Sequence, residues 1–112
     1  MFLKLNHQQL DVYTASRKLV YECYKLTMML PQEERFGMIT QIRRAALSVH
    51  LNIAEGASRK SETERKRFYE MARGSLVEVD AALDVAFDLH YLAKFNSDQL
   101  GTILVQTFKI LS

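Results

Sequence analysis

The sequence contains little of the chemistry that makes turns, with one proline and four glycines in 112 residues. An all-β sandwich or barrel needs many tight connections, and those connections depend on residues of this kind. The near absence of turn residues therefore predicts an all-α protein. A length of 112 residues suits one helical bundle and leaves little room for a catalytic domain with a separate substrate domain.

Other absences bear on the compartment. A single cysteine, Cys23, excludes an internal disulfide and fits a reducing environment. The first seven residues lack the long apolar stretch and cleavage site of a signal peptide, and no run approaches the ~18 apolar residues of a membrane span. We therefore expect a cytoplasmic protein of bacterial type, with no membrane partner.

Charge is present in nearly equal amounts but is unevenly distributed. The 15 basic and 13 acidic residues give a net charge of +2. Residues 1–32 hold four bases and two acids, residues 33–75 hold nine and six, and residues 76–112 hold two and five. The small total is therefore a cancellation between a basic middle and an acidic final third.

Periodicity and punctuation predict four helices in one domain spanning residues 1–112, over about 8–30, 36–55, 62–92 and 98–111. Pro31 ends the first, and Gly56 is suited to a left-handed exit from the second. Ser61 and Glu64 have the spacing of a capping box at the start of the third. Short connections favour an up-down-up-down four-helix bundle, with a three-helix bundle and a loosely attached last helix as the alternative.

Each predicted helix carries apolar residues at spacings of three and four, which indicate its buried face. These core positions are Val12, Ser16, Leu19, Cys23, Leu26 and Leu30; Ile39, Ile42, Ala46, Val49 and Ile53; Phe68, Ala72, Ser75, Val79, Ala82, Ala86 and Leu89; and Leu100, Ile103, Leu104, Thr107, Phe108 and Leu111. Further apolar residues lie off these faces: Leu10, Tyr13, Val20, Tyr21 and Tyr24 on the first helix, and Leu47, Leu51 and Ala54 on the second. This surplus is explained either by packing on two neighbouring helices or by contact with a partner protein.

A polar stripe lies on the second predicted helix at spacings of three, four, four and three, and comprises Gln41, Arg44, Ser48, Asn52 and Glu55. A stripe of this kind is either a solvated face or an interaction surface. Its mixture of amides, a hydroxyl and a guanidinium is less typical of plain solvation than lysine and glutamate are.

The same region carries a family resemblance. Residues 41–56 read Q-I-R-R-A-A-x-S-x-x-x-N-I-A-E-G, followed by R-K-S at 59–61 and G-S-L-x-E at 74–78. From about residue 10 to residue 92, the chain resembles the four-helix-bundle family named for proteins encoded in intervening sequences of 23S ribosomal RNA. The resemblance implies a cytoplasmic bacterial bundle that forms a ring-like homo-oligomer, a pentamer. His50 departs from the pattern, because relatives have proline or another small residue there.

That family is also similar to the accessory proteins of diversity-generating retroelements, which bind nucleic acid and a reverse transcriptase. In this chain, bases exceed acids around the corner between the second and third helices. The candidate nucleic-acid-binding residues are Arg43, Arg44, Arg59, Lys60, Arg65, Lys66 and Arg67. Flexible cations at a helix start suit phosphate contacts, so the first hypothesis is an oligomer that binds RNA or DNA without sequence preference.

The second hypothesis is an assembly module that contacts only protein, in which the basic middle of one copy meets the acidic third helix of the next and closes a ring. The third is a small ribonuclease similar to the HEPN families, which pair arginine with histidine. In the signature of those families the histidine follows the arginine by a few residues. Arg44 and His50 have that spacing, whereas Arg43 and His50 share a helix face. The surrounding pattern follows the intervening-sequence family, so we expect a binding protein without catalysis.

No cofactor or metal is expected, because His7, His50 and His90 lie far apart in the sequence and show no ligand spacing. Gly74 stands inside the third predicted helix, where glycine costs roughly 1 kcal/mol relative to alanine. Its position before Ser75 predicts a close approach by the second helix near residues 41–44.

Overall fold

The structure, a computed structural model, describes residues 2, 3, 5 and 11–112. Over these residues it contains four α-helices and one short 3-10 helix: α1 (Asp11–Thr27), η2 (Gln32–Glu34), α2 (Met38–Ser58), α3 (Glu62–Asp88) and α4 (Asp98–Leu111). No strand occurs in this described part of the chain. The predicted all-α four-helix bundle is confirmed. The expected start of the first helix at residue 8, the apolar residue Leu10 and the histidine His7 lie outside the described residues.

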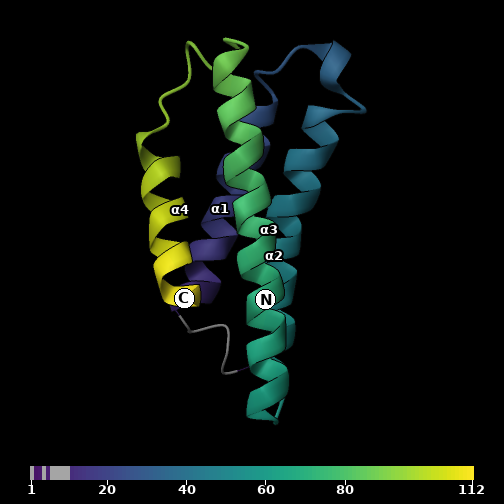
Figure 1. Ribbon diagram of the computed structural model, residues 1–112, viewed down its shortest axis with the longest axis vertical. Coiled ribbons are helices and arrows are strands. Elements are labelled where there is room, and N and C mark those ends of the chain that lie inside the picture. Colours follow the sequence, from purple (N-terminus) through teal and green to yellow (C-terminus); the bar gives the residue numbers. More distant parts are fainter. Residues whose placement is uncertain (1, 4, 6–10) are drawn as a thin grey trace.

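The helices pack in the order α1, α2, α3, α4, and α4 closes the bundle against α1 (Figure 1). The molecule measures 44 × 24 × 24 Å, with the helices along its long axis. Because α4 packs on both α1 and α3 and buries Leu100, Ile103 and Thr107, it is an integral part of the bundle. The alternative of a three-helix bundle with a loose last helix is therefore wrong.

The two longest helices, α2 and α3, extend beyond the rest of the bundle at one end. α3 has 27 residues, whereas α4 has only 14 and ends with its C-cap residue Ser112 beside Arg73, in the middle of α3. The first turns of α3 and the last turns of α2 therefore project past the end of α4 (Figure 1). This projection carries the connection between α2 and α3.

The buried faces follow the predicted spacing on three helices. All six core positions expected on the first helix are buried, as are Ile42, Ala46, Val49 and Ile53 on α2. On α3 the face is shifted, since Leu76 and Leu83 are buried in place of Ser75 and Ala82. Leu89 is 48% exposed, so its assignment to the core is wrong. α3 ends at Asp88, and Leu89 stands just past that end.

Two glycines have roles opposite to those predicted. α2 continues to Ser58, and no glycine among the described residues has a positive φ, so Gly56 is not a left-handed exit. A Cβ at Gly56 would lie 3.0 Å from Cβ of Phe68 and 3.0 Å from the ring of Tyr69. Gly56 is thus where α2 and α3 approach closely. A Cβ at Gly74 would meet nothing within 4 Å, so the predicted close approach there is wrong.

The ends of α2 and α3 at the opposite pole also differ from prediction. α2 begins at Met38, whose N–H donates to Oε1 of Glu34 at 3.3 Å. α3 ends four residues before the expected residue 92, because His90 takes a left-handed conformation with φ of 62°. The N–H of Tyr91 then donates to the carbonyl of Ala86, which closes the helix end in the manner of a Schellman motif.

Candidate nucleic-acid interface

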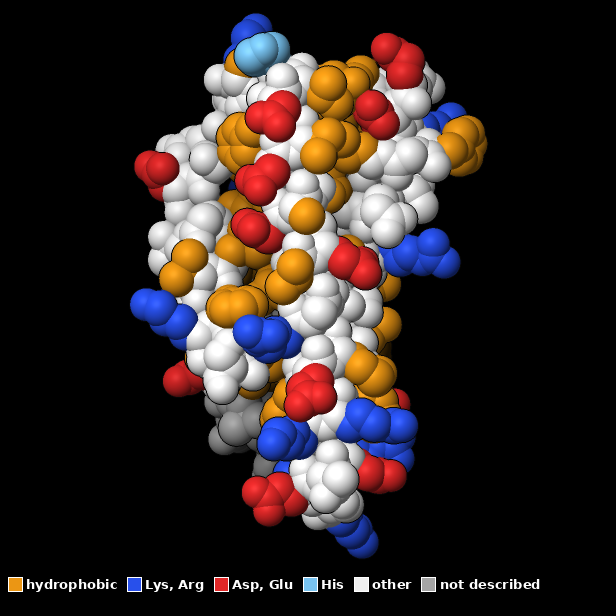
Figure 2. Space-filling view, in the orientation of Figure 1, with side chains coloured by type: hydrophobic (Ala, Val, Ile, Leu, Met, Phe, Trp, Pro, Cys, Tyr) orange, Lys and Arg blue, Asp and Glu red, His pale blue; other side chains and the backbone are white. Residues whose placement is uncertain are grey.

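Residues 59–61 connect α2 to α3 at the projecting end of the bundle. We call the following set the basic corner: Arg59, Lys60, Arg65, Lys66 and Arg67. Figure 2 shows basic side chains gathered at this end, with a few acidic ones among them. Ser61 caps α3 by accepting a hydrogen bond from the N–H of Glu64 at 3.3 Å, so the predicted helix start is confirmed.

Arg65 holds the connection in place. Its Nη1 donates to the carbonyl of Arg59 at 2.9 Å and to the carbonyl of Lys60 at 2.8 Å. The guanidinium of Arg65 therefore satisfies two carbonyl groups of the turn that follows α2. Arg65 is half-buried, and its Nη1 stabilises the backbone conformation of the connection between α2 and α3.

An aromatic ring organises two further arginines. The guanidinium carbons of Arg59 and Arg67 lie 5.0 and 5.2 Å from the ring centroid of Phe68, within the range of cation–π attraction. Arg59 also forms an ion pair with Glu55, with 3.2 Å between Nη2 and Oε2. Its charge is therefore partly neutralised, whereas Lys60, at the same corner, is exposed and has no ion pair among the described residues.

A surface hollow lies beside the corner, where the end of α4 meets α3. Its lining comprises Glu62, Arg65, Lys66, Tyr69, Glu70, Arg73, Leu111 and Ser112. Arg73 lines the hollow, with Nε donating to Oγ of Ser112 at 3.2 Å and the guanidinium carbon 4.6 Å from the ring centroid of Phe108. Three bases and two acids make this hollow only mildly basic, and two of those bases, Arg65 and Lys66, also belong to the basic corner.

Arg43 and Arg44 do not join this corner. They lie 15 or more residues before Arg59 on a helix that runs without interruption, which separates them by roughly 22 Å along its axis. Nε of Arg43 donates to Oγ1 of Thr27 at 2.8 Å, and its guanidinium carbon lies 4.7 Å from the ring centroid of Tyr24. Arg43 therefore joins α2 to α1, and Arg44 is exposed on the outer side of α2.

His50 occupies the same seam between α1 and α2. Its Nδ1 lies 2.6 Å from Oγ of Ser16, and its ring centroid lies 4.7 Å from that of Tyr13, with 52° between the ring planes. Arg43 and His50, the pair that shares a helix face, thus both contact α1 across this seam, whereas Arg44, which has the spacing of the ribonuclease signature, is exposed. Sequence spacing had placed Arg43 and His50 on one face of α2 but could not show that the face is covered by α1.

The polar stripe of α2 is divided between two environments. Oγ of Ser48 lies 2.9 Å from Oγ of Ser75 on α3, and Nδ2 of Asn52 donates to the carbonyl and to Oγ of Ser48 at 2.9 and 3.1 Å. The middle of the stripe is therefore a polar contact between two helices. Its outer members, Gln41 and Glu55, are exposed.

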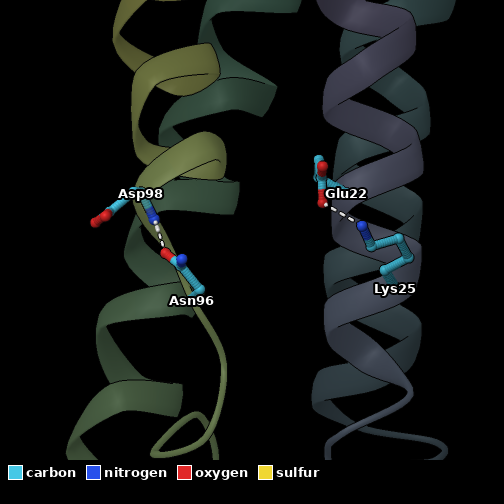
Figure 3. A network of polar contacts seen from close by, with 4 residues as sticks. All are labelled: Glu22, Lys25, Asn96 and Asp98. Carbon is cyan, nitrogen blue, oxygen red and sulfur yellow. Dashed lines mark hydrogen bonds and ion pairs between the residues drawn. The ribbon is translucent and has the colours of Figure 1, made fainter.

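Other polar groups support the fold away from the corner. Glu22 is buried on α1 and pairs with Lys25 at 3.3 Å, while Oδ1 of Asn96 accepts a hydrogen bond from the N–H of Asp98 at the start of α4 (Figure 3). Burial, and secondly the charge of Glu22, raise the pKa of the Cys23 thiol to about 12. A thiol held protonated in this way behaves as a small core side chain.

Within the described ranges, no group of three His, Cys, Asp or Glu residues is placed to hold a metal ion. Nor does any described helix combine the length and apolar character needed to cross a membrane.

Comparison with known proteins gives one family. The sequence model described as 23S rRNA-intervening sequence protein matches residues 8–112. A search of curated proteins found no match.

Proposed function

This chain belongs to the 23S rRNA-intervening sequence protein family, and we propose that it is a non-catalytic, self-associating bundle that binds RNA or DNA through the basic corner. The observation that carries the proposal is the exposed position of Lys60, Lys66 and Arg67 on the part of the molecule that projects past α4. Cations on a projection can reach the phosphates of a polyanion without a clash from the rest of the bundle.

The geometry of the corner supports phosphate contact in a second way. A cation–π contact uses the face of a guanidinium and leaves donors in the plane of the group, so Arg67 can contact the Phe68 ring and an anion together. Arg65 fixes the backbone between the two helices through its bonds to Arg59 and Lys60. A corner held in this way loses little conformational entropy when it binds.

Self-association would raise the affinity of a weak site. One corner offers few cations, and Glu62 and Glu64 in the first turn of α3 oppose them. In a ring-like homo-oligomer, such as the pentamer that the family resemblance implies, the corner is repeated in each subunit. Several weak contacts to one nucleic-acid backbone then act together.

The contacts of Arg43 and His50 support binding without catalysis, since both side chains contact α1. A second candidate function is a protein scaffold without nucleic-acid binding. It is favoured by Leu47 and Leu51, which are exposed on the outer side of α2.

Fluorescence anisotropy with labelled single-stranded RNA and duplex DNA, measured between about 50 and about 200 mM salt, separates the two candidates. We expect the double variant Lys60→Glu/Lys66→Glu to lose roughly tenfold or more in affinity and to show a shallower salt dependence. The control Lys18→Glu/Lys94→Glu carries the same change in charge on exposed residues away from the corner. Equal losses in both variants would place the binding elsewhere, and absence of binding by the wild type at low salt would favour the scaffold.

A further inference from the structure

An apolar groove runs along the seam between α3 and α4. Its volume is about 350 Å3, and its lining comprises Leu76, Val77, Asp80, Leu104, Val105, Phe108 and Lys109. Val77 is 50% exposed and Val105 is 55% exposed, one on each helix. The groove therefore presents apolar side chains from two helices to the outside of the molecule.

Glycines on both helices flank this groove without any role inside the bundle. Gly101 lies one turn before Val105 on α4, and Gly74 lies three residues before Val77 on α3, so each shares a face with a groove residue. A Cβ at either position would meet nothing within 4 Å. Glycine inside a helix costs roughly 1 kcal/mol relative to alanine, and on an exposed face it permits close approach by another backbone.

The rim of the groove is acidic on the α3 side. Asp80 and Asp84 are exposed one turn apart, and Asp88 follows after another turn. None of the three forms an ion pair with another described residue. Figure 2 shows acidic side chains in a row along the upper half of α3, next to hydrophobic side chains in the seam. The macrodipole of α3 disfavours acids near the C-terminal end of the helix, so a cation from another molecule would stabilise them.

The outer side of α2 has the complementary character. Leu47 is 39% exposed and Leu51 is 55% exposed, and Arg44 precedes Leu47 by three residues on the same face. The nearby carboxylate, Glu55, is paired with Arg59 at 3.2 Å. This surface of α2 is therefore apolar and positive, whereas the groove is apolar and negative along the α3 rim.

We propose that the exposed Leu47–Leu51 face of α2 in one copy of the chain docks into the α3–α4 groove of a second copy, with Arg44 against the row of Asp80 and Asp84. This inference rests on the self-association proposed above and names its surface. The two surfaces differ and lie on different parts of one bundle, so each copy can offer both at once and the contact is head-to-tail. The basic corner takes no part, which leaves it available to nucleic acid in every subunit.

Sedimentation velocity over a range of concentrations tests the pairing with two variants. Leu51→Asp places a charge on the α2 face, and Val105→Asp places one in the groove. Each alone is expected to be monomeric, since a head-to-tail contact needs both surfaces. Mixed in equal amounts, they are expected to form a one-to-one dimer and nothing larger, because one intact face and one intact groove remain. Phe36→Asp, at a side chain 89% exposed on the connection before α2, is the control and should assemble as the wild type does.

The charge pairing is tested in the same way. Arg44→Asp should weaken assembly, and adding Asp84→Arg in the same chain should restore it. Circular dichroism checks that each variant is helical, and Leu51→Asn or Val105→Asn replaces a variant that does not fold.

Two results would overturn the pairing while leaving self-association intact: variants that assemble like the wild type, or a mixture that stays monomeric. A wild type that is monomeric at every concentration would overturn self-association itself. Anisotropy with RNA on the same samples reports on the basic corner independently.

Discussion

The phenol of Tyr91 donates a hydrogen bond to Oε2 of Glu34 at 3.0 Å and so joins the two connections at the pole opposite the basic corner. The other oxygen of the same carboxylate accepts the N–H of Met38 at the start of α2. One carboxylate therefore caps α2 and holds the segment that leads from α3 to α4. The two residues lie 57 positions apart in the sequence. Their hydrogen bond joins the connection between α1 and α2 to the connection between α3 and α4.

The Tyr91–Glu34 bond predicts a loss of stability at alkaline pH. The hydrogen bond to Glu34, then burial and the charges of Glu34 and Glu33, raise the pKa of Tyr91 above its usual value of 10.0. A raised pKa means that the folded state favours the protonated phenol, so the contribution is complete below pH 10 and is lost as the pH rises through the folded value. Thermal denaturation should show a larger fall in Tm between pH 9 and pH 11 for the wild type than for Tyr91→Phe. Parallel curves for the two proteins would contradict the assignment.

Gly56→Ala is expected to destabilise the bundle. The added Cβ would lie 3.0 Å from Cβ of Phe68, and the helices must separate to admit it. Overpacking of this kind costs about 1–3 kcal/mol, which outweighs the gain in helix propensity of roughly 1 kcal/mol. Urea denaturation should give a lower free energy of unfolding for the variant.

Gly74→Ala is the matched control for that substitution. Within one bundle its Cβ meets nothing within 4 Å, so in the monomeric Val105→Asp background helix propensity should raise the free energy of unfolding by about 0.5–1 kcal/mol. A destabilised Gly74→Ala protein in that background would show that α3 has a close neighbour inside the bundle at this position.

Arg43→Met is expected to lower stability by about 1–2 kcal/mol, because it removes the hydrogen bond to Thr27 and the cation–π contact with Tyr24. Affinity for RNA should fall only by the small amount expected from the loss of one charge far from the basic corner. Urea denaturation and anisotropy on the same sample distinguish the two effects. A large loss of affinity without a loss of stability would show that Arg43 belongs to the binding surface.

Prediction succeeded where every residue of a helix face carried the same signal. On the first helix and the turn that follows it, the six expected core positions from Val12 to Leu30 follow one spacing of three and four, and all six are buried, whereas Tyr21 of the second apolar set is 65% exposed. On α3 two patterns share Ala72, Val79 and Ala86, and one adds Ser75 while the other adds Leu76. Burial of an apolar side chain is favoured over burial of a hydroxyl, so Leu76 faces the core and Ser75 meets Ser48 beside it.

The spacing of residues along the sequence could not show the roles of the glycines. Whether a glycine permits close packing depends on what stands opposite it, and a sequence of one chain does not specify the facing residue. Phe68 and Tyr69 face Gly56 because α3 folds back along α2, while Gly74 and Gly101 face outward.

By itself, the sequence determined that the described part of the chain folds mainly as four α-helices, that Ser61 caps the start of the third, and that the charge is basic in the middle and acidic toward the end. Those properties depend on local periodicity, capping and composition, which act over a few residues. Only the tertiary structure decided which basic residues share a surface. Arg59 and Arg67 meet over Phe68 because a chain reversal joins α2 to α3, whereas Arg43 lies against Thr27 because α1 packs along α2.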